Sequence, residues 1–485
     1  MKKMRYSLLT AIAAFMIMAV SCINDTITTS PSATLTFSRD TVNFDTVFTD
    51  LGTPTARLVV RNPNKKGVVI SSIRMKSPDS PFTFNVDGQS GTQFSDIEIM
   101  GRDSIYVFIE CFIPESEGND IHLREDDLEF ITNGVTQDVH IEAYGQNVTR
   151  LRGVTLEEDM RITAFRPVVI FDSLKIGSSA TLWIDPGAKV LFHDGAELIV
   201  EGRIDARGEP GRMIDMRGDR LDNVLTDVGY DILAGQWKGI SIRQNSFNNH
   251  LEYVDMRSTA TGLTVDSCAV LDIPKLTIIN SWLHNSQGSV LTSRYAKVDA
   301  YGSCFSEAGG SVIDLRGGRH EFLQCTFANN YLFSAITGPI ISLSHCLPGE
   351  ENDLGEGPLM KANFRNSIIY GLASDINLPE LVASDVYFEY VSFKAEGTDD
   401  ENFISCLWNT DPLFLTDRQA YYFNYRLQPD SPVIEAGNPE FVTETVRFDM
   451  DGVDRLGHGN PSLGAYQFVP NPEDEPVPDS PDAAQ

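Results

Sequence analysis

The segment VDAYGSCFSEAGGSVIDLRGGR, residues 298–319, repeats features of the segments on both sides of it. These neighbours are LTIINSWLHNSQGSVLTSRYAK at residues 276–297 and HEFLQCTFANNYLFSAITGPII at residues 320–341. Ser281, Ser303 and Cys325 occupy equivalent positions, 22 residues apart, and Gly-Ser-Val recurs at the same step in the first two segments. A self-similar period in the low twenties is typical of a solenoid.

The same position continues at Cys346 and Ser367, each 21 residues further on, so we expect one coil for every step. The segments carry β-branched and aromatic residues, and they lack the LxxLxL pattern and the helical half of a leucine-rich repeat. The repeat therefore predicts a right-handed parallel β-helix, in which each coil buries its apolar face against the next. Stacked coils place equivalent side chains about 4.8 Å apart, so these serines and cysteines should form an internal ladder.

Other stretches extend this region in both directions. DSLKIGSSATLWIDPGAKVLFHDGAELIVEGRIDARG, residues 172–208, is a run of very short strands that end at Gly or Asp. It resembles the opening coils of the pectate-lyase-like right-handed β-helix superfamily. DPLF at 411–414, YRLQPDSPVIEAGN at 425–438 and DMDGVDRLGHGNPSLGAYQF at 449–468 resemble the ends of exported proteins of that group. The resemblance spans residues 154–468 and implies the fold, but one fold serves many functions.

Residues 34–148 have a different pattern. Short alternating runs such as ATLTFSRDTVNFDTVF are separated by Gly, Asp, Asn and Pro, and about seven such strands are typical of a β-sandwich. RLVVRNPNKKGVVISSI and DSIYVFIE resemble the Ig-like sandwich of the abnormal-spindle/hydin type, which implies a spacer or adhesion module. The polar residues 149–153 are the expected boundary. The expected fold class is all-β, an N-terminal Ig-like β-sandwich followed by a right-handed parallel β-helix solenoid.

The N-terminus predicts a lipoprotein signal peptide over residues 1–21. A basic n-region precedes YSLLTAIAAFMIMAV, an uncharged apolar run that is short for a membrane span. Cys22 follows Ala-Val-Ser and resembles a bacterial lipobox, which implies cleavage before Cys22 and acylation of this residue, a stable membrane anchor. Residues 22–33 should form a tether. We expect an outer-membrane location, on either the cell surface or the periplasmic face.

The net charge of −30 repels nucleic acid at long range, so no nucleic-acid partner is expected. Residues 469–485 are rich in Pro and acids and should form a disordered tail. The cysteines form no CxxC motif, and no histidine lies at zinc-ligand spacing. We expect buried free thiols at Cys111, Cys268, Cys304, Cys325, Cys346 and Cys406.

Candidate ligand-binding residues lie in and after an acidic stretch at 213–232, which interrupts the coil rhythm and predicts a loop. Asp219, Arg220 and Asp222 offer groups for a sugar or for calcium, although a solvated loop is the simpler interpretation. Trp237 follows this loop. It either stacks on a sugar ring or packs over the end of the core.

A second acidic motif, Asp449-Met450-Asp451, makes Asp449 and Asp451 candidate calcium ligands. The later bidentate Glu of an EF-hand loop is missing, so turn formation is the alternative. Calcium is the one cofactor that the sequence suggests. We predict no catalytic residue, because the sequence has no HExxH or GxSxG motif and no evident carboxylate pair on adjacent coils.

Three functions remain open. The first is a membrane-anchored, non-catalytic envelope lipoprotein that presents its β-helix to a polysaccharide or a surface protein. The second is a polysaccharide lyase or glycoside hydrolase with its site on the outer face of the β-helix, which would require carboxylates gathered in one groove. The third is an adhesion or assembly protein that uses the Ig-like domain for contact.

Overall fold

The computed structural model describes residues 26–225, 228–346, 357–377 and 385–470. The predicted signal peptide, Cys22 and nearly all of the predicted tail lie outside these residues. Within them the regular structure is almost entirely β, as predicted, with three short 3-10 turns as the only helix. The chain divides into two compact units, residues 1–147 and 148–485. No helix among the described residues has the length and apolar character needed to span a membrane.

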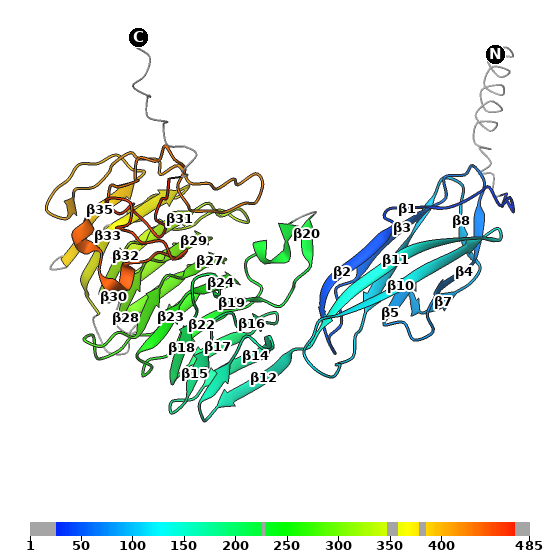
Figure 1. The fold of residues 1–485 in the computed structure, drawn as a ribbon, viewed down its shortest axis with the longest axis horizontal. Helices are drawn as coiled ribbons and strands as arrows, with labels where there is room; N and C mark the ends of the chain where they lie inside the picture. The colour runs from blue at the N-terminus through cyan, green and yellow to red at the C-terminus, as the bar shows by residue number, and fades with distance from the viewer. Residues whose placement is uncertain (1–25, 226–227, 347–356, 378–384, 471–485) are drawn as a thin grey trace, which may run out of the picture. The chain divides into compact units, whose positions relative to one another are not determined.

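The first unit contains two sheets (Figure 1), and most of their strand pairs are antiparallel. One sheet has the order β1-β3-β9-β5-β6, and the other has the order β2-β11-β10-β4-β7 with β8 paired to β4. The strands are β1 (Thr36–Phe37), β2 (Thr41–Phe48), β3 (Ala56–Arg61), β4 (Val68–Met75), β5 (Phe82–Val86), β6 (Gln89–Gly91), β7 (Gln93–Phe94), β8 (Ile97–Ile99), β9 (Ser104–Cys111), β10 (His122–Thr132) and β11 (Val135–Gln146).

One apolar core is built from both sheets of this unit. Along β10, buried and less buried residues alternate from Asp126 to Thr132, so Leu128 and Phe130 face inward. Leu58 and Val60 on β3 and Val107 on β9 belong to the same core. The antiparallel sheets therefore agree in part with the Ig-like sandwich expected from the sequence.

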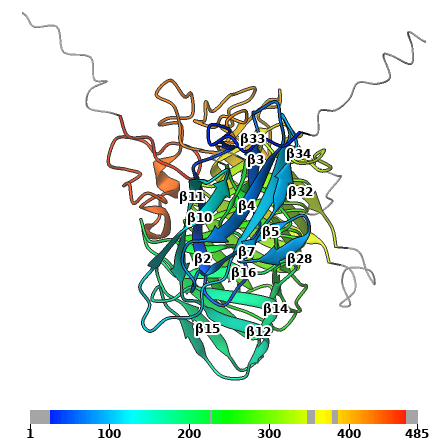
Figure 2. The same cartoon turned by 90° about the vertical axis from the view of Figure 1, so that its right-hand side faces the viewer.

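The second unit is dominated by one 23-stranded sheet whose strands pair in parallel (Figures 1 and 2). Its strands are β12 (Thr149–Leu156), β13 (Met160–Ile162), β14 (Val168–Ile176), β15 (Thr181–Ile184), β16 (Lys189–Phe192), β17 (Glu197–Val200), β18 (Arg203–Arg207), β19 (Ile214–Gly218), β22 (Gly239–Ile242), β23 (Asn249–Glu252), β24 (Val254–Thr259), β25 (Leu263–Val265), β26 (Leu276–Ile279), β27 (Trp282–Ser286), β28 (Leu291–Tyr301), β29 (Cys304–Ala308), β30 (Ile313–Leu323), β31 (Thr326–Asn329), β32 (Ile341–Ser344), β33 (Leu359–Gly371), β34 (Ile376–Asn377), β35 (Asp385–Phe393) and β36 (Phe403–Ile404).

The parallel pairings join each strand to one in the next coil. One column runs through β16, β19, β24, β27, β29, β31 and β33. Because every coil donates its backbone hydrogen bonds to its neighbours, the arrangement is consistent with the predicted β-helix solenoid. The remaining elements are the hairpin of β20 (Asn223–Leu225) and β21 (Val228–Gly229) and the turns η1 (Tyr230–Ile232), η2 (Pro439–Phe441) and η3 (Glu444–Val446).

The predicted ladder is present, with one correction. The backbone N–H of Ser281 donates to Ser303 Oγ at 3.1 Å, and that of Cys325 donates to Ser367 Oγ at 3.1 Å. Leu323 pairs with Arg365, so Ser367 lies in the coil directly after Cys325. The predicted step through Cys346 is therefore wrong. The single coil step from Cys325 to Ser367 spans 42 residues, because extra residues can leave a coil without disturbing the stack.

Aromatic rings continue the repeat inside the solenoid. Phe322, Phe364, Phe388 and Phe403 are register partners in successive coils. Neighbouring rings in this series are nearly parallel, with centroids 4.8–5.0 Å apart. Identical positions therefore bury identical side chains, which is the physical reason for the sequence repeat.

Two further expectations have clear outcomes. Cys111, Cys268, Cys304 and Cys325 are buried free thiols, as predicted; Cys346 is also buried, and Cys406 is half-buried. The division between the two units falls at residues 147 and 148, directly before the expected boundary at residues 149–153. Residues 149–153 themselves belong to β12, which pairs in parallel with β14. Half-buried Thr149 and Leu151 alternate with exposed Arg150 and Arg152, a pattern that suits a strand.

Candidate functional site

The predicted acidic loop after β19 folds back onto the coil surface. Three corner residues of successive coils, Ser258, Asn285 and Glu307, have left-handed φ angles of 66°, 56° and 51°. Each precedes a residue of one register series, Thr259, Ser286 and Ala308. Ser258 Oγ donates to the backbone oxygen of Asp231 at 2.6 Å, and Asn285 Nδ2 donates to it at 2.9 Å. The corner stack thus holds η1 of the loop in place.

A cluster of charged side chains lies under this loop. Arg257 contacts three carboxylates, those of Asp215 and Asp255 at 2.8 Å and that of Asp231 at 3.0 Å. His284 Nε2 lies 3.0 Å from Asp255. Asp215 and Asp255 are register partners on β19 and β24. The expectation that adjacent coils carry no carboxylate pair is therefore wrong, because the loop between the two strands hides their register in the sequence.

The electrostatics of the cluster favour ionised aspartates at two positions. Burial favours the protonated form of Asp255, but Arg257 and His284 outweigh it and lower its pKa to about 2. Burial likewise opposes ionisation of Asp231, while Arg217 and Arg257 lower its pKa. The two arginines therefore hold negative charge at a partly buried position.

A pocket of about 330 Å³ opens beside the cluster. Asp231, Asp255, Arg257 and His284 line it from the loop and the coils. Aromatic residues line it as well, namely Trp282, Tyr331, Phe333, Tyr421, Tyr422 and Phe423. The volume lies at the lower end of the range of about 300–1,000 Å³ for small-molecule sites. A pocket that combines aromatic faces with a few fixed charges suits a polar ligand that has apolar ring faces.

Trp282 is positioned by two contacts. Its ring stacks on His284 with centroids 4.0 Å apart and an interplanar angle of 16°. Its Nε1 donates to Ser306 Oγ at 2.9 Å. The half-buried indole is therefore held in one orientation at the pocket wall.

Glu307 is the most unusual group of the pocket. It is 3% exposed, and its Oε2 has no hydrogen-bond partner among the described residues. The Tyr425 hydroxyl donates to Oε1. Burial raises the pKa of Glu307, and the opposing effects of Ser306 and Tyr425 offset this only in part. This carboxyl group therefore takes up a proton at a higher pH than an exposed glutamate does.

The residues predicted to bind a ligand near the loop have other roles. Trp237 is fully buried, stacks on Phe192 at 3.8 Å and donates from Nε1 to the backbone oxygen of Arg257 at 2.8 Å. Its proposed role as a sugar platform is therefore wrong, because no face of the ring reaches solvent. The packing alternative describes it correctly.

Asp219, Arg220 and Asp222 brace the loop and are not among the residues that line the pocket. Asp219 contacts His193 Nδ1 at 2.8 Å. Arg220 donates from Nε to Asp222 at 2.9 Å, and its guanidinium lies 3.5 Å from the centroid of the Tyr230 ring. These contacts join the loop to His193 and link residues within the loop to one another.

The candidate calcium ligands are engaged by the protein itself. Asp449 is buried, and its Oδ1 accepts from the backbone N–H groups of Asp451 and Val453 at 2.9 and 2.8 Å. The Oδ2 atom accepts from Gln467 at 2.7 Å, and Asp451 pairs with Arg426. These bonds account for both carboxylates through turn formation, the alternative interpretation of the motif.

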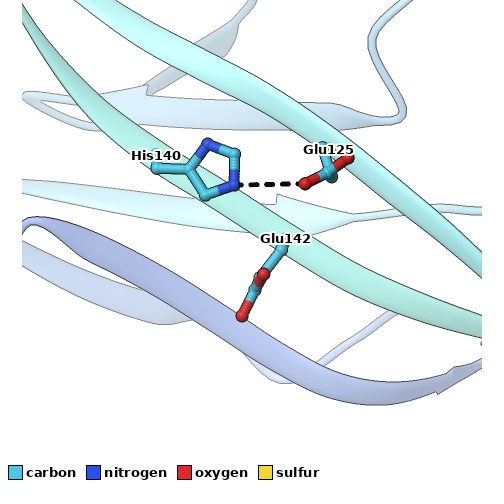
Figure 3. A group of neighbouring side chains, drawn as sticks. All are labelled: Glu125, His140 and Glu142. Atoms are coloured by element: carbon cyan, nitrogen blue, oxygen red, sulfur yellow. Dashed lines mark ion pairs between the residues drawn. The ribbon is translucent and has the colours of Figure 1, made fainter.

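A different group of potential metal ligands lies in the first unit (Figure 3). Glu125 on β10 and His140 and Glu142 on β11 bring one ligand atom each within 4.8 Å of one another. Glu125 and Glu142 are register partners, as are Asp127 and His140. The sequence did not reveal the group, because its members meet only across a hairpin. His140 Nδ1 lies 3.0 Å from Asp127, which raises the pKa of His140, so ion pairing explains the group without a metal.

One sequence signal could have revealed the pocket. Asp-Met-Arg occurs at 215–217 and again at 255–257, and the structure places the two copies in register on β19 and β24. No such signal marks Glu307, because it occupies the same corner position as Ser258 and Asn285 but lies in no repeated motif.

No known family model and no curated protein matches the chain. Similar solved structures include a protein of unknown function from Porphyromonas gingivalis W83, with 13% identity over 25% of this chain and 59% of that one and a TM-score of 0.18. The E. coli chaperone DraB has 14% identity over 24% and 55%, with a TM-score of 0.17. A family 123 glycoside hydrolase from Clostridium perfringens has 9% identity over 25% and 26%, with a TM-score of 0.17.

This chain therefore spans less than two thirds of the length of each of these proteins. Likenesses of this size assign neither a family nor an activity to the chain.

Proposed function

We propose that this chain is a lipid-anchored bacterial envelope protein that binds a neutral glycan in the pocket beside Arg257. In this proposal Cys22 carries the anchor in the outer membrane, the Ig-like unit is a spacer, and a right-handed β-helix of the pectate-lyase-like type carries the site. The observation that supports glycan binding is the pocket itself, where aromatic side chains face a fixed set of charges.

The aromatic lining favours a sugar over other polar ligands. Sugar rings present C–H groups on their faces and hydroxyls at their edges, so they pack on aromatic faces and bond to polar groups around them. Trp282 offers such a face in a fixed orientation. Asp231 and Asp255 offer acceptors for hydroxyl groups at the same pocket.

The charge balance favours a neutral sugar. Arg257 is bound by Asp215, Asp231 and Asp255, and Arg217 lies 3.0 Å from Asp231. Both arginines are therefore neutralised by carboxylates that the protein supplies. An acidic glycan would meet uncompensated negative charge here and on a protein of net charge −30, which disfavours its binding.

Binding can be measured by affinity electrophoresis and calorimetry of the full chain against xylan, mannan, β-glucan and starch. Trp282→Ala should weaken binding about tenfold, since an aromatic contact of this kind contributes about 1.4 kcal/mol. Trp183→Ala is the matched control, because Trp183 is half-buried on the same unit, under Arg161 and Arg203, and does not line the pocket. Equal affinities of the two variants, or no binding by the unmodified chain to any of these polymers, would refute the proposal.

A further inference from the structure

Glu125, His140 and Glu142 form one cluster on the face of the β10–β11 hairpin that points away from the core (Figure 3). Each residue offers one ligand atom, and these atoms lie within 4.8 Å of one another. Glu125 is exposed and the other two residues are half-buried, so an ion can enter from solvent. An imidazole nitrogen with two carboxylate oxygens is a ligand set that suits zinc.

Asp127 orients the imidazole of His140 for this role. Its Oδ1 lies 3.0 Å from His140 Nδ1, and its Oδ2 accepts from Lys76 Nζ at 2.7 Å. A carboxylate beside Nδ1 keeps a proton on that nitrogen, which leaves Nε2 as the atom that can coordinate a metal. Histidines that bind metals almost always have such a partner behind the ring. His140 is therefore held with Nε2 directed at the two glutamates.

The spacing and the charge of the cluster both favour a bound cation. His140 Nε2 lies 3.6 Å from Glu125 Oε1. A hydrogen bond between nitrogen and oxygen is shorter, about 2.7–3.2 Å. Two ligands of one tetrahedral zinc ion lie about 3.4 Å apart, because each bond is about 2.0–2.1 Å long. Glu125 and Glu142 are also register partners, and like charges directly opposite each other destabilise a sheet. A cation between them removes this repulsion.

We propose that His140 Nε2 and one carboxylate oxygen each from Glu125 and Glu142 bind a Zn²⁺ ion. In the metal-free chain, ion pairing with protonated His140 holds these residues together; the metal replaces the proton on Nε2, which passes to solvent. The nitrogen ligand selects Zn²⁺ over Ca²⁺ and Mg²⁺, which bind oxygen ligands. Three protein ligands leave the fourth position of the ion to water. The site belongs to the first unit and is independent of the glycan pocket in the second unit.

Calorimetric titration of the full chain with zinc chloride, after removal of metals by a chelator, tests this site. We expect one Zn²⁺ ion per chain and binding of Ca²⁺ and Mg²⁺ at least about tenfold weaker. Glu142→Gln should weaken Zn²⁺ binding at least about tenfold, since even the loss of a group behind a ligand costs about 10–100-fold. Asp138→Asn is the matched control, because it removes an exposed charge of the same strand but no ligand atom. Its affinity should change less than about threefold, as expected for a surface charge.

Differential scanning calorimetry of the same proteins separates metal binding from folding. Glu142→Gln removes one of two opposed charges, so the metal-free variant should unfold at no lower temperature than the unmodified chain. Zn²⁺ should raise the unfolding temperature of the unmodified chain, because it binds the folded hairpin, and should raise that of Glu142→Gln less. The proposal is overturned if the chain takes up no Zn²⁺ or binds Ca²⁺ equally well. Equal affinities of the unmodified chain and Glu142→Gln, or equal losses in Glu142→Gln and Asp138→Asn, overturn it as well.

Discussion

Replacement of Trp237 by alanine should destabilise the second unit strongly. The indole is fully buried and stacks on Phe192 with an interplanar angle of 6°. Loss of a buried side chain of this size costs about 3–5 kcal/mol through lost burial and the remaining cavity. The substitution also leaves the backbone oxygen of Arg257 without its donor at 2.8 Å. Trp237→Phe keeps most of the ring and loses this donor, so it should cost about 1–3 kcal/mol.

Tryptophan fluorescence reports on the unfolding of the second unit, which contains Trp237. All four tryptophans, Trp183, Trp237, Trp282 and Trp408, lie beyond residue 147, so the emission does not report on the first unit. Urea midpoints of the variants are compared with that of Trp183→Ala, whose half-buried ring should contribute much less. If the midpoints of Trp237→Ala and Trp183→Ala coincide, the packing role deduced for Trp237 is incorrect.

Three further predictions concern charge and anchoring. Arg257 and His284 lower the pKa of Asp255 to about 2, so its contribution to stability is present above pH 4 and is lost as the pH falls toward 2. Between pH 4 and 2 the urea midpoint of Asp255→Asn should therefore change less than that of the unmodified chain. Burial lowers the pKa of Lys275 to about 8, so the folded state loses this proton before the unfolded state does. Stability should therefore rise between pH 8 and 10, and Lys275→Met should remove that rise; a persistent rise in the variant would contradict it. Cys22→Ala should move the protein from the membrane fraction to the soluble fraction on immunoblots, and retention in the membrane would argue against the lipid anchor.

The repeat was predictable because stacked coils impose the same environment on equivalent residues. The 22-residue step from Ser281 to Ser303 and Cys325 corresponds to neighbouring coils. The prediction was wrong at Cys346, because the residue that follows Cys325 in the ladder is Ser367, 42 residues further on. Loop length does not alter the stack, so a constant step is a guide only where coils carry no insertion.

The site was not predictable in the same way. Asp215 and Asp255 are far apart in the sequence, and their pairing depends on a loop that leaves the coil between them. From its position after that loop, Trp237 could either bind a sugar or pack over the core, and only the packing against Phe192 decides that it is buried.

The sequence by itself determined an all-β chain with a stacked repeat, since hydrophobic periodicity and turn residues act locally and from coil to coil. Only the tertiary structure decided which polar side chains meet. Glu307 and Asp231 reach one pocket because a corner and a loop of different coils converge there. Burial raises the pKa of Glu307, whereas Arg217 and Arg257 lower the pKa of Asp231. The neighbours of a residue in the sequence determine neither which side chains meet it nor how deeply it is buried.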